Sequence, residues 1–235
     1  MIGRRGGEAW PETREGLITL QSEVGGGFPE PWTPGSVEEL TVGACFVCFG
    51  RGGSGPGRAG DPGWAAAVLW RAEAGPVAWA VMRGAAGAAY EPGLLALREG
   101  PLLARALDAL PQRPDVLLVN GTGRDHPRRF GLACHLGWAL GIPSIGVTHR
   151  PLLAVGAWPP DERGARSPLI LEGETVGYWV RTRRGSRPLA AHAGWRTSPS
   201  LAAEFVLRWS RRRTPEPLRI ARMLARSARA EDVPR

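Results

Sequence analysis

PDVLLVNGTGRDHPRRFGLACHLG, at residues 114–137, indicates the fold class more clearly than any other segment, and we call it the deciding stretch. It opens on DVLLV at 115–119, an almost fully apolar run typical of a strand at the centre of a parallel sheet. After a polar turn, residues 129–140 predict a helix that Gly141 closes. SIGVT at 144–148 predicts a second buried strand. A strand, a helix and a strand in this order indicate an α/β fold.

Three further strands are predicted before this stretch. TVGACFVCF at 41–49 is a short apolar run, and residues 64–71 and 76–83 predict two more strands joined by a turn. Consecutive strands with short connections indicate an antiparallel meander. The sequence therefore predicts a mixed α/β sheet that is flanked by helices, in which three antiparallel strands are followed by parallel strands. An RNase H-like sheet fits this order, among other choices.

Helices are predicted before and after the deciding stretch. Residues 94–110 place Leu103, Leu107 and Leu110 on one helical face, and Pro111 stops this helix. Towards the C-terminus we expect a strand pair at 177–182 and 187–192, and helices at 201–213 and 217–230. The strongly basic faces of the last two helices are typical of solvated surfaces.

The chain is expected to form one domain. Residues 1–38 are rich in Gly, Pro and Glu and predict a loose N-terminal segment with a short helix near 14–23, whereas 39–230 predict a single domain. No window approaches the roughly 20 apolar residues that a membrane helix needs. Three cysteines argue against a disulfide framework and for a reducing compartment. We expect a soluble, cytoplasmic protein with no membrane partner.

The charge of the chain suits an anionic partner. The formal net charge is +8, and arginine supplies all the basic residues other than histidine, because the sequence contains no lysine. Such a balance favours a partner with phosphate, sulfate or carboxylate groups. The alternative is compositional bias, since the chain also holds 33 Gly and 22 Pro. Both explanations stay open.

Four sequence blocks, in order, resemble the endonuclease V family, which nicks nucleic acid near deoxyinosine or inosine. The blocks are VGACF at 42–46, YEPGLLALREGPLL at 90–103, the deciding stretch with IPSIGVTHRPL at 142–152, and RPLAAHAGWRTS at 187–198, followed by TPEPLR at 214–219. The resemblance covers roughly residues 40–225 and implies an RNase H-like fold. HPRR followed by G-x-A-x-H, within the deciding stretch, is the most specific part.

The resemblance also implies a place for divalent metal, which family members hold with carboxylates on the first strand, the central helix and the end of the fourth strand. At those places this chain has Cys45, Glu99 and Asn120, so one of three carboxylates remains. Mg²⁺ prefers charged oxygen ligands, and a thiol prefers softer metals. The resemblance therefore predicts a largely dismantled metal site, and we expect no bound metal and no cofactor.

Other positions that match the family's motifs are altered too. The assisting lysine falls on His149, the assisting histidine on Trp195, and a further family histidine on Thr122. Trp195 cannot transfer protons. In the nucleic-acid wedge Tyr90 remains and can stack on a base, but Glu91 beside it would repel phosphates.

These replacements suggest a polar pocket that could hold an anionic group. Bidentate contacts from Arg128, Arg129 and Arg196 suit a phosphate or sulfate. The predicted substrate-binding residues are Tyr90, Thr122, Arg128, Arg129, Trp195 and Arg196, and the predicted catalytic residues are Cys45, Glu99, Asn120 and His149.

Three functions are compatible with this pattern. The favoured one is a repurposed, metal-independent enzyme of specialised-metabolite biosynthesis, in which Glu99 or His149 acts as a base while a small anionic substrate loses phosphate or sulfate. A variant of this idea makes Cys45 a thiol nucleophile beside His149 and Asn120, against the simpler view that Cys45 is a small buried hydrophobe. The alternatives are a non-catalytic protein that binds nucleic acid or a protein partner, and a residual inosine-specific endonuclease.

Overall fold

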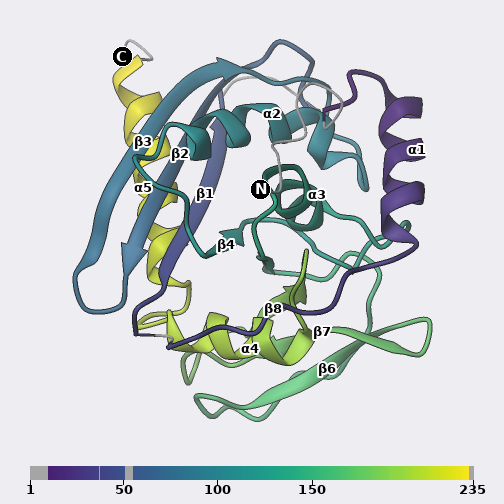
Figure 1. Cartoon of the computed structure of the whole chain (residues 1–235), viewed down its shortest axis with the longest axis vertical. Coiled ribbons are helices and arrows are strands. Elements are labelled where there is room, and N and C mark those ends of the chain that lie inside the picture. The colour runs from purple at the N-terminus through teal and green to yellow at the C-terminus, as the bar shows by residue number, and fades with distance from the viewer. Residues whose placement is uncertain (1–9, 37, 51–54, 233–235) are drawn as a thin grey trace.

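The computed structural model describes residues 10–36, 38–50 and 55–232, and its strands form one eight-stranded sheet in this part of the chain. The strand order is β3-β2-β1-β4-β5-β8-β7-β6. The strands are β1 (Thr41–Phe49), β2 (Pro62–Arg71), β3 (Gly75–Ala85), β4 (Val116–Val119), β5 (Ser144–Thr148), β6 (Arg166–Leu171), β7 (Glu174–Val180) and β8 (Leu189–Ala193). The helices are α1 (Arg14–Gly25), α2 (Leu95–Asp108), α3 (Leu132–Leu140), α4 (Pro199–Arg208) and α5 (Glu216–Asp232). Figure 1 shows α2 and α5 on opposite sides of the β1–β2–β3 meander.

The pairing of the strands confirms the predicted fold class. β1, β2 and β3 form the antiparallel meander, and β4 lies parallel to both β1 and β5. β8 then runs antiparallel to β5, and β7 antiparallel to β8. The edge strand β6, which pairs with β7, was not predicted from the sequence. The result is a mixed α/β sheet of the RNase H-like kind.

The core lies on both faces of the sheet because the central strands are apolar on both sides. All four residues of β4 are buried, and they alternate between the two faces. Leu117 packs with the buried leucines of α2 and α3 on one face. Leu118 packs with Phe205 of α4 and Ala221 of α5 on the other. Continuous burial of this kind is expected of a parallel strand that helices cover on both sides.

Two helices have an end that differs from the predicted one by three residues or more. α3 begins at Leu132 rather than at residue 129, because Arg129 has a φ of 56° that no helical residue adopts. α4 ends at Arg208, so the arginines at 211–213 lie in the connection to α5 and not on a helix face.

The N-terminal part contains the predicted helix, α1, which Thr13 caps by accepting a hydrogen bond from the Gly16 amide at 3.1 Å. Leu17 and Gln21 of α1 are buried against the domain. The domain division at residue 38 stays a prediction. No helix in the described ranges is long and apolar enough to cross a bilayer.

Candidate nucleic-acid site

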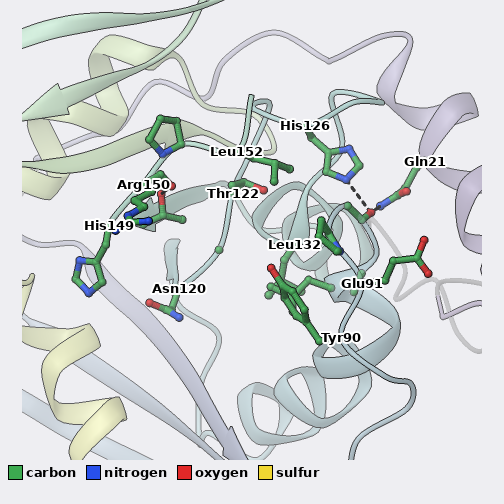
Figure 2. A pocket seen from close by; sticks show the side chains of 17 residues that line it. Gln21, Tyr90, Glu91, Asn120, Thr122, His126, Leu132, His149, Arg150 and Leu152 are labelled. Atoms are coloured by element: carbon green, nitrogen blue, oxygen red, sulfur yellow. Dashed lines mark hydrogen bonds between the residues drawn. The ribbon is translucent and has the colours of Figure 1, made fainter. Parts of the chain in front are cut away.

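A cavity of about 360 Å³ opens at the carboxyl ends of β4 and β5. Three segments form most of its wall, namely residues 90–93, 120–122 and 148–152, and Gln21 of α1 and His126 complete one side. Figure 2 shows their side chains converging on this space from separate segments of the chain. The ends of neighbouring parallel strands are the usual place for a ligand in an α/β sheet, because the connecting loops diverge there.

Four of the residues predicted from the sequence lie together in this cavity. Tyr90, Asn120, Thr122 and His149 all line it. Tyr90 is 48% exposed, so its ring is open to a partner. Asn120 and Thr122 are half-buried at the end of β4 and supply an amide and a hydroxyl. Partial burial and the charges of Arg213 and Arg222 lower the pKa of His149, which is therefore neutral at pH 7.

One wall of the cavity is fixed by hydrogen bonds to the carbonyl oxygen of Gly93. Gln21 Nε2 donates to it at 3.1 Å, and a guanidinium nitrogen of Arg128 donates at 3.2 Å. Burial lowers the pKa of His126 to about 4, so its ring is neutral. Since its Nδ1 accepts from the Arg128 amide at 3.1 Å, its Nε2–H is the donor to Gly93 O at 2.8 Å.

The opposite wall is fixed by Asp125, a residue that the sequence did not single out. This fully buried carboxylate accepts the amide hydrogens of Leu152, Leu153 and Ala154, at 2.6 to 2.9 Å. Asp125 thereby holds the loop that carries His149. Its place beside His126, within the most specific sequence block, was the only local signal.

His192 supports the same loop from β8. Burial lowers the pKa of His192, so the ring is neutral. The Thr148 hydroxyl donates to Arg150 O at 2.7 Å, so the His192 Nε2–H donates to Thr148 Oγ1 at 2.8 Å. No role for His192 was predicted from the sequence.

The predicted arginine and tryptophan contacts lie outside the cavity wall. Arg128 Nε donates to Gln21 Oε1 at 2.8 Å, behind that wall. Arg129 pairs with Glu172 at 2.8 Å and with Glu174 at 3.5 Å. These contacts make both arginines part of the scaffold, and substrate binding by either stays a prediction.

Trp195 and Arg196 also face other parts of the chain. The ring of Trp195 lies 5.9 Å from that of Phe28 and 6.4 Å from that of Phe130. Arg196 has a φ of 51°, and its carbonyl oxygen accepts from the Trp32 amide at 2.7 Å. Substrate binding by Trp195 and Arg196 stays a prediction.

Cys45 and Glu99 are not among the residues that line the cavity. Cys45 is 1% exposed, and burial together with the nearby charge of Glu99 raises the pKa of its thiol. Burial raises the pKa of Glu99 to about 8, against the opposing charge of Arg98. At pH 7 Cys45 is therefore a protonated thiol and a poor nucleophile, and Glu99 is mostly a neutral acid.

The donor set does not fit the divalent metal that the family resemblance implies. Asn120 is neutral, and its Oδ1 lies 3.4 Å from a guanidinium nitrogen of Arg222. A positively charged guanidinium therefore faces Asn120 on the side where a ligand oxygen would face a metal ion. Across the residues that the structure describes, no three His, Cys, Asp or Glu side chains form a group able to hold a metal ion. Mg²⁺ requires several oxygen ligands, preferably charged.

Known proteins resemble this chain over most of its length. The family model for Endonuclease V matches residues 55–223. The Endonuclease V of Thermus thermophilus is 44% identical over 171 residues, which are 71% of this chain and 76% of that protein. The Endonuclease V of Methanopyrus kandleri is 46% identical over 147 residues, or 62% of this chain and only 63% of the relative's length. The crystal structure of Endonuclease V from Streptomyces avermitilis superposes with a TM-score of 0.83 at 36% identity, covering 94% of this chain and 95% of that one.

These findings overturn the favoured functional prediction. A repurposed biosynthetic enzyme acting on a small molecule is wrong, because these relatives are all named as endonucleases and the likeness extends across the cavity segments. The family is one of enzymes that act on nucleic acid, as the sequence blocks had indicated. This chain belongs to the endonuclease V family.

Proposed function

We propose that this chain acts on nucleic acid as an endonuclease of the endonuclease V type, and that a strand is bound across the cavity at the ends of β4 and β5. The observation that carries the proposal is the family match over residues 55–223, which includes all three segments of the cavity wall. The net charge of +8 supports a polyanionic partner.

The cavity supplies groups suited to a splayed base and its phosphate. The exposed Tyr90 ring offers a stacking platform for a base. Asn120 and Thr122 present an amide and a hydroxyl that can donate to, or accept from, a base edge or a phosphate oxygen. His149, neutral and exposed at the rim, can accept a proton from a water molecule.

The residues at the three family metal positions limit the expected rate of cleavage. With a thiol at Cys45 and an amide at Asn120, Glu99 is the one carboxyl left of the three family positions. In metalloenzymes, loss of a single side chain that hydrogen-bonds to a metal ligand already lowers metal affinity or activity roughly 10- to 100-fold. We therefore expect cleavage to be slow.

A second candidate function is binding of nucleic acid without cleavage. One observation favours it, namely that the Asn120 side chain faces the guanidinium of Arg222 rather than a cluster of carboxylates. The two candidates share the ligand and differ only in the outcome for the phosphodiester bond.

An oligonucleotide assay tests both. The Endonuclease V of Ciona intestinalis, which shares this fold, is seen in complex with DNA containing an inosine followed by a ribo-adenosine, so an inosine-containing strand is the probe. It is incubated with the protein and Mg²⁺, Mn²⁺ or EDTA, beside a matched strand with guanine at that position. The proposal expects slow cutting of the inosine strand alone. A strand that is bound but stays intact would establish the second candidate, and a strand neither bound nor cut would overturn both.

A further inference from the structure

Four arginines lie near one another on one side of the cavity, and we call them the arginine track. Arg187 lies in the loop between β7 and β8, Arg213 in the connection from α4 to α5, and Arg222 and Arg226 on α5. The track reaches the cavity through Arg222 and Arg213, which lie near Asn120 and His149. In Figure 2 the yellow C-terminal part of the chain passes next to these two residues.

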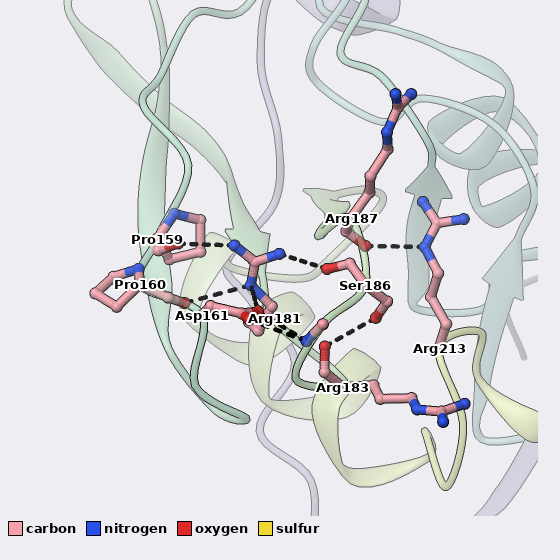
Figure 3. Close-up of polar contacts among 9 residues, drawn as sticks. Pro159, Pro160, Asp161, Arg181, Arg183, Ser186, Arg187 and Arg213 are labelled. Carbon is pink, nitrogen blue, oxygen red and sulfur yellow. Dashed lines mark hydrogen bonds and ion pairs between the residues drawn. The ribbon is translucent and has the colours of Figure 1, made fainter.

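The outer end of the track is held by a main-chain contact. Arg213 Nε donates to the carbonyl oxygen of Arg187 at 2.8 Å. Figure 3 shows both guanidinium groups extending in the same direction beyond this bond. Burial and the charge of Arg187 lower the pKa of Arg213, as expected for two close cations.

The inner end reaches the cavity wall. Arg222 donates to Asn120 Oδ1 at 3.4 Å, and its guanidinium lies 5.1 Å from the ring centre of Phe46. Arg226 lies 5.9 Å from the same ring. The Nε of Arg222 is enclosed and has no hydrogen-bond partner among the described atoms. The side chain of Arg222 is thus held against Asn120 and Phe46, unlike an arginine on a freely solvated helix face.

The arginines of the track differ from other arginines of the chain in their ion pairing. Other arginines, such as Arg98 and Arg129, pair with carboxylates. In residues 10–36, 38–50 and 55–232, no ion pair joins a carboxylate to any of the four track arginines. Cations gathered in this way repel one another, and an anion bound between them would remove that cost.

We propose that the arginine track binds the phosphodiester backbone of a nucleic-acid strand that enters the cavity, with Arg222 supplying the positive charge at Asn120. This assignment rests on the proposed function, because it takes nucleic acid as the ligand. Guanidinium groups suit phosphate, since their planar fork donates two parallel hydrogen bonds to its oxygens. The place that the family gives to a divalent cation is then served by a side chain.

The test is the affinity for a fluorescein-labelled, single-stranded, inosine-containing oligonucleotide, measured by fluorescence anisotropy in EDTA. Arg222→Ala is compared with Arg105→Ala, which removes the same charge from an exposed site on α2, across the sheet from α5. We expect Arg222→Ala to weaken binding about tenfold and to lower the slope of log K against log salt by about 0.7. The affinity of Arg105→Ala for the oligonucleotide is expected to stay within about twofold of that of the parent.

Two further variants keep the test decisive. Arg222→Lys retains the charge but loses the fork, so its affinity is expected to lie between those of the parent and Arg222→Ala. If Arg222→Ala fails to fold, Arg213→Ala tests the same track. Equal affinities for Arg222→Ala and Arg105→Ala would overturn the track while leaving the proposed function intact, whereas a parent protein that binds no strand would overturn the proposed function itself.

Discussion

The proposed binding of a strand in the cavity depends chiefly on two side chains, Tyr90 and Asn120. Tyr90 presents a half-exposed ring from the loop before α2, and Asn120 presents an amide where β4 ends. One offers a surface for a base, and the other lies beside the guanidinium of Arg222. Changes at these two positions should therefore separate stacking from charge.

Replacing Tyr90 by Ala should weaken binding of the inosine-containing strand about tenfold, because one base loses its stacking platform. Tyr90→Phe keeps the ring and should bind like the parent. Anisotropy titration measures both, and thermal melting should show that both variants remain folded, since the ring is 48% exposed. Equal affinity of the Ala and Phe variants would remove Tyr90 from the binding surface.

Asn120→Asp should weaken strand binding in EDTA about fivefold or more, because the new carboxylate neutralises Arg222 and repels phosphate. Asn120→Ser removes the amide without adding charge and should change the affinity by no more than about twofold. If the Asp variant binds as tightly as the Ser variant, the charge at this position does not matter for the strand.

At the scale of elements, α1 and the loop after β5 decide the shape of the cavity. Gln21 of α1 is 1% exposed and donates to the carbonyl oxygens of Gly93 and Phe130. His126 donates to Gly93 O as well, and Asp125 holds the loop after β5. These contacts link distant parts of the sequence, so the loss of each one should lower the free energy of unfolding.

Gln21→Leu should lower the free energy of unfolding by about 2 kcal/mol, because buried carbonyl groups and Arg128 Nε lose their partner. Glu23→Gln, at an exposed position on the same helix, serves as the control and should be nearly neutral. Urea unfolding gives both values, and a Gln21→Leu protein as stable as the control would contradict this role for α1.

His126 should make stability depend on pH. Its folded pKa of about 4 lies below the ordinary histidine pKa of 6.5, so its contribution to stability is complete above pH 6.5 and falls as the pH drops towards 4. Between pH 7 and pH 5 the parent should lose about 2 kcal/mol more than His126→Gln, at 1.36 kcal/mol per pKa unit. Because both proteins share Glu99 and His192, the comparison isolates His126. Parallel pH profiles would show that His126 is not buried as a neutral ring.

Elements with a strong local signal were predictable, and long-range contacts were not. β4 and β5 are continuous apolar runs, so the sequence revealed them. β6 was missed because its burial is mixed and Pro168 interrupts it, as happens in edge strands. The pairing of Arg222 with Asn120 spans 102 positions, and nothing local distinguishes Arg222 from a solvated helix residue.

The candidate site was likewise predictable from the sequence only in part. Tyr90, Asn120, Thr122 and His149 were predicted through the family resemblance, and all four line the cavity. The polar contacts that shape its walls, made by Gln21 and Asp125, depend on tertiary packing and could not be inferred from spacing.

In the molecule as a whole, the arginine track and the cavity lie next to each other, at the carboxyl ends of β4 and β5. The chain carries a net charge of +8. Within the arginine track, Arg222 donates to Asn120, so a side chain supplies positive charge at the cavity. Binding of a strand should therefore depend on monovalent salt through released counterions, and not on Mg²⁺.

The most direct measurement is the dissociation constant of the inosine-containing strand with Mg²⁺ and with EDTA at matched ionic strength, followed by a titration from 50 to 200 mM salt. We predict equal constants within about twofold under the two conditions. We also predict a loss of affinity of about fiftyfold across the salt range if the four track arginines each contact a phosphate. A strand that binds only when Mg²⁺ is present, or with no dependence on salt, would contradict the central claim.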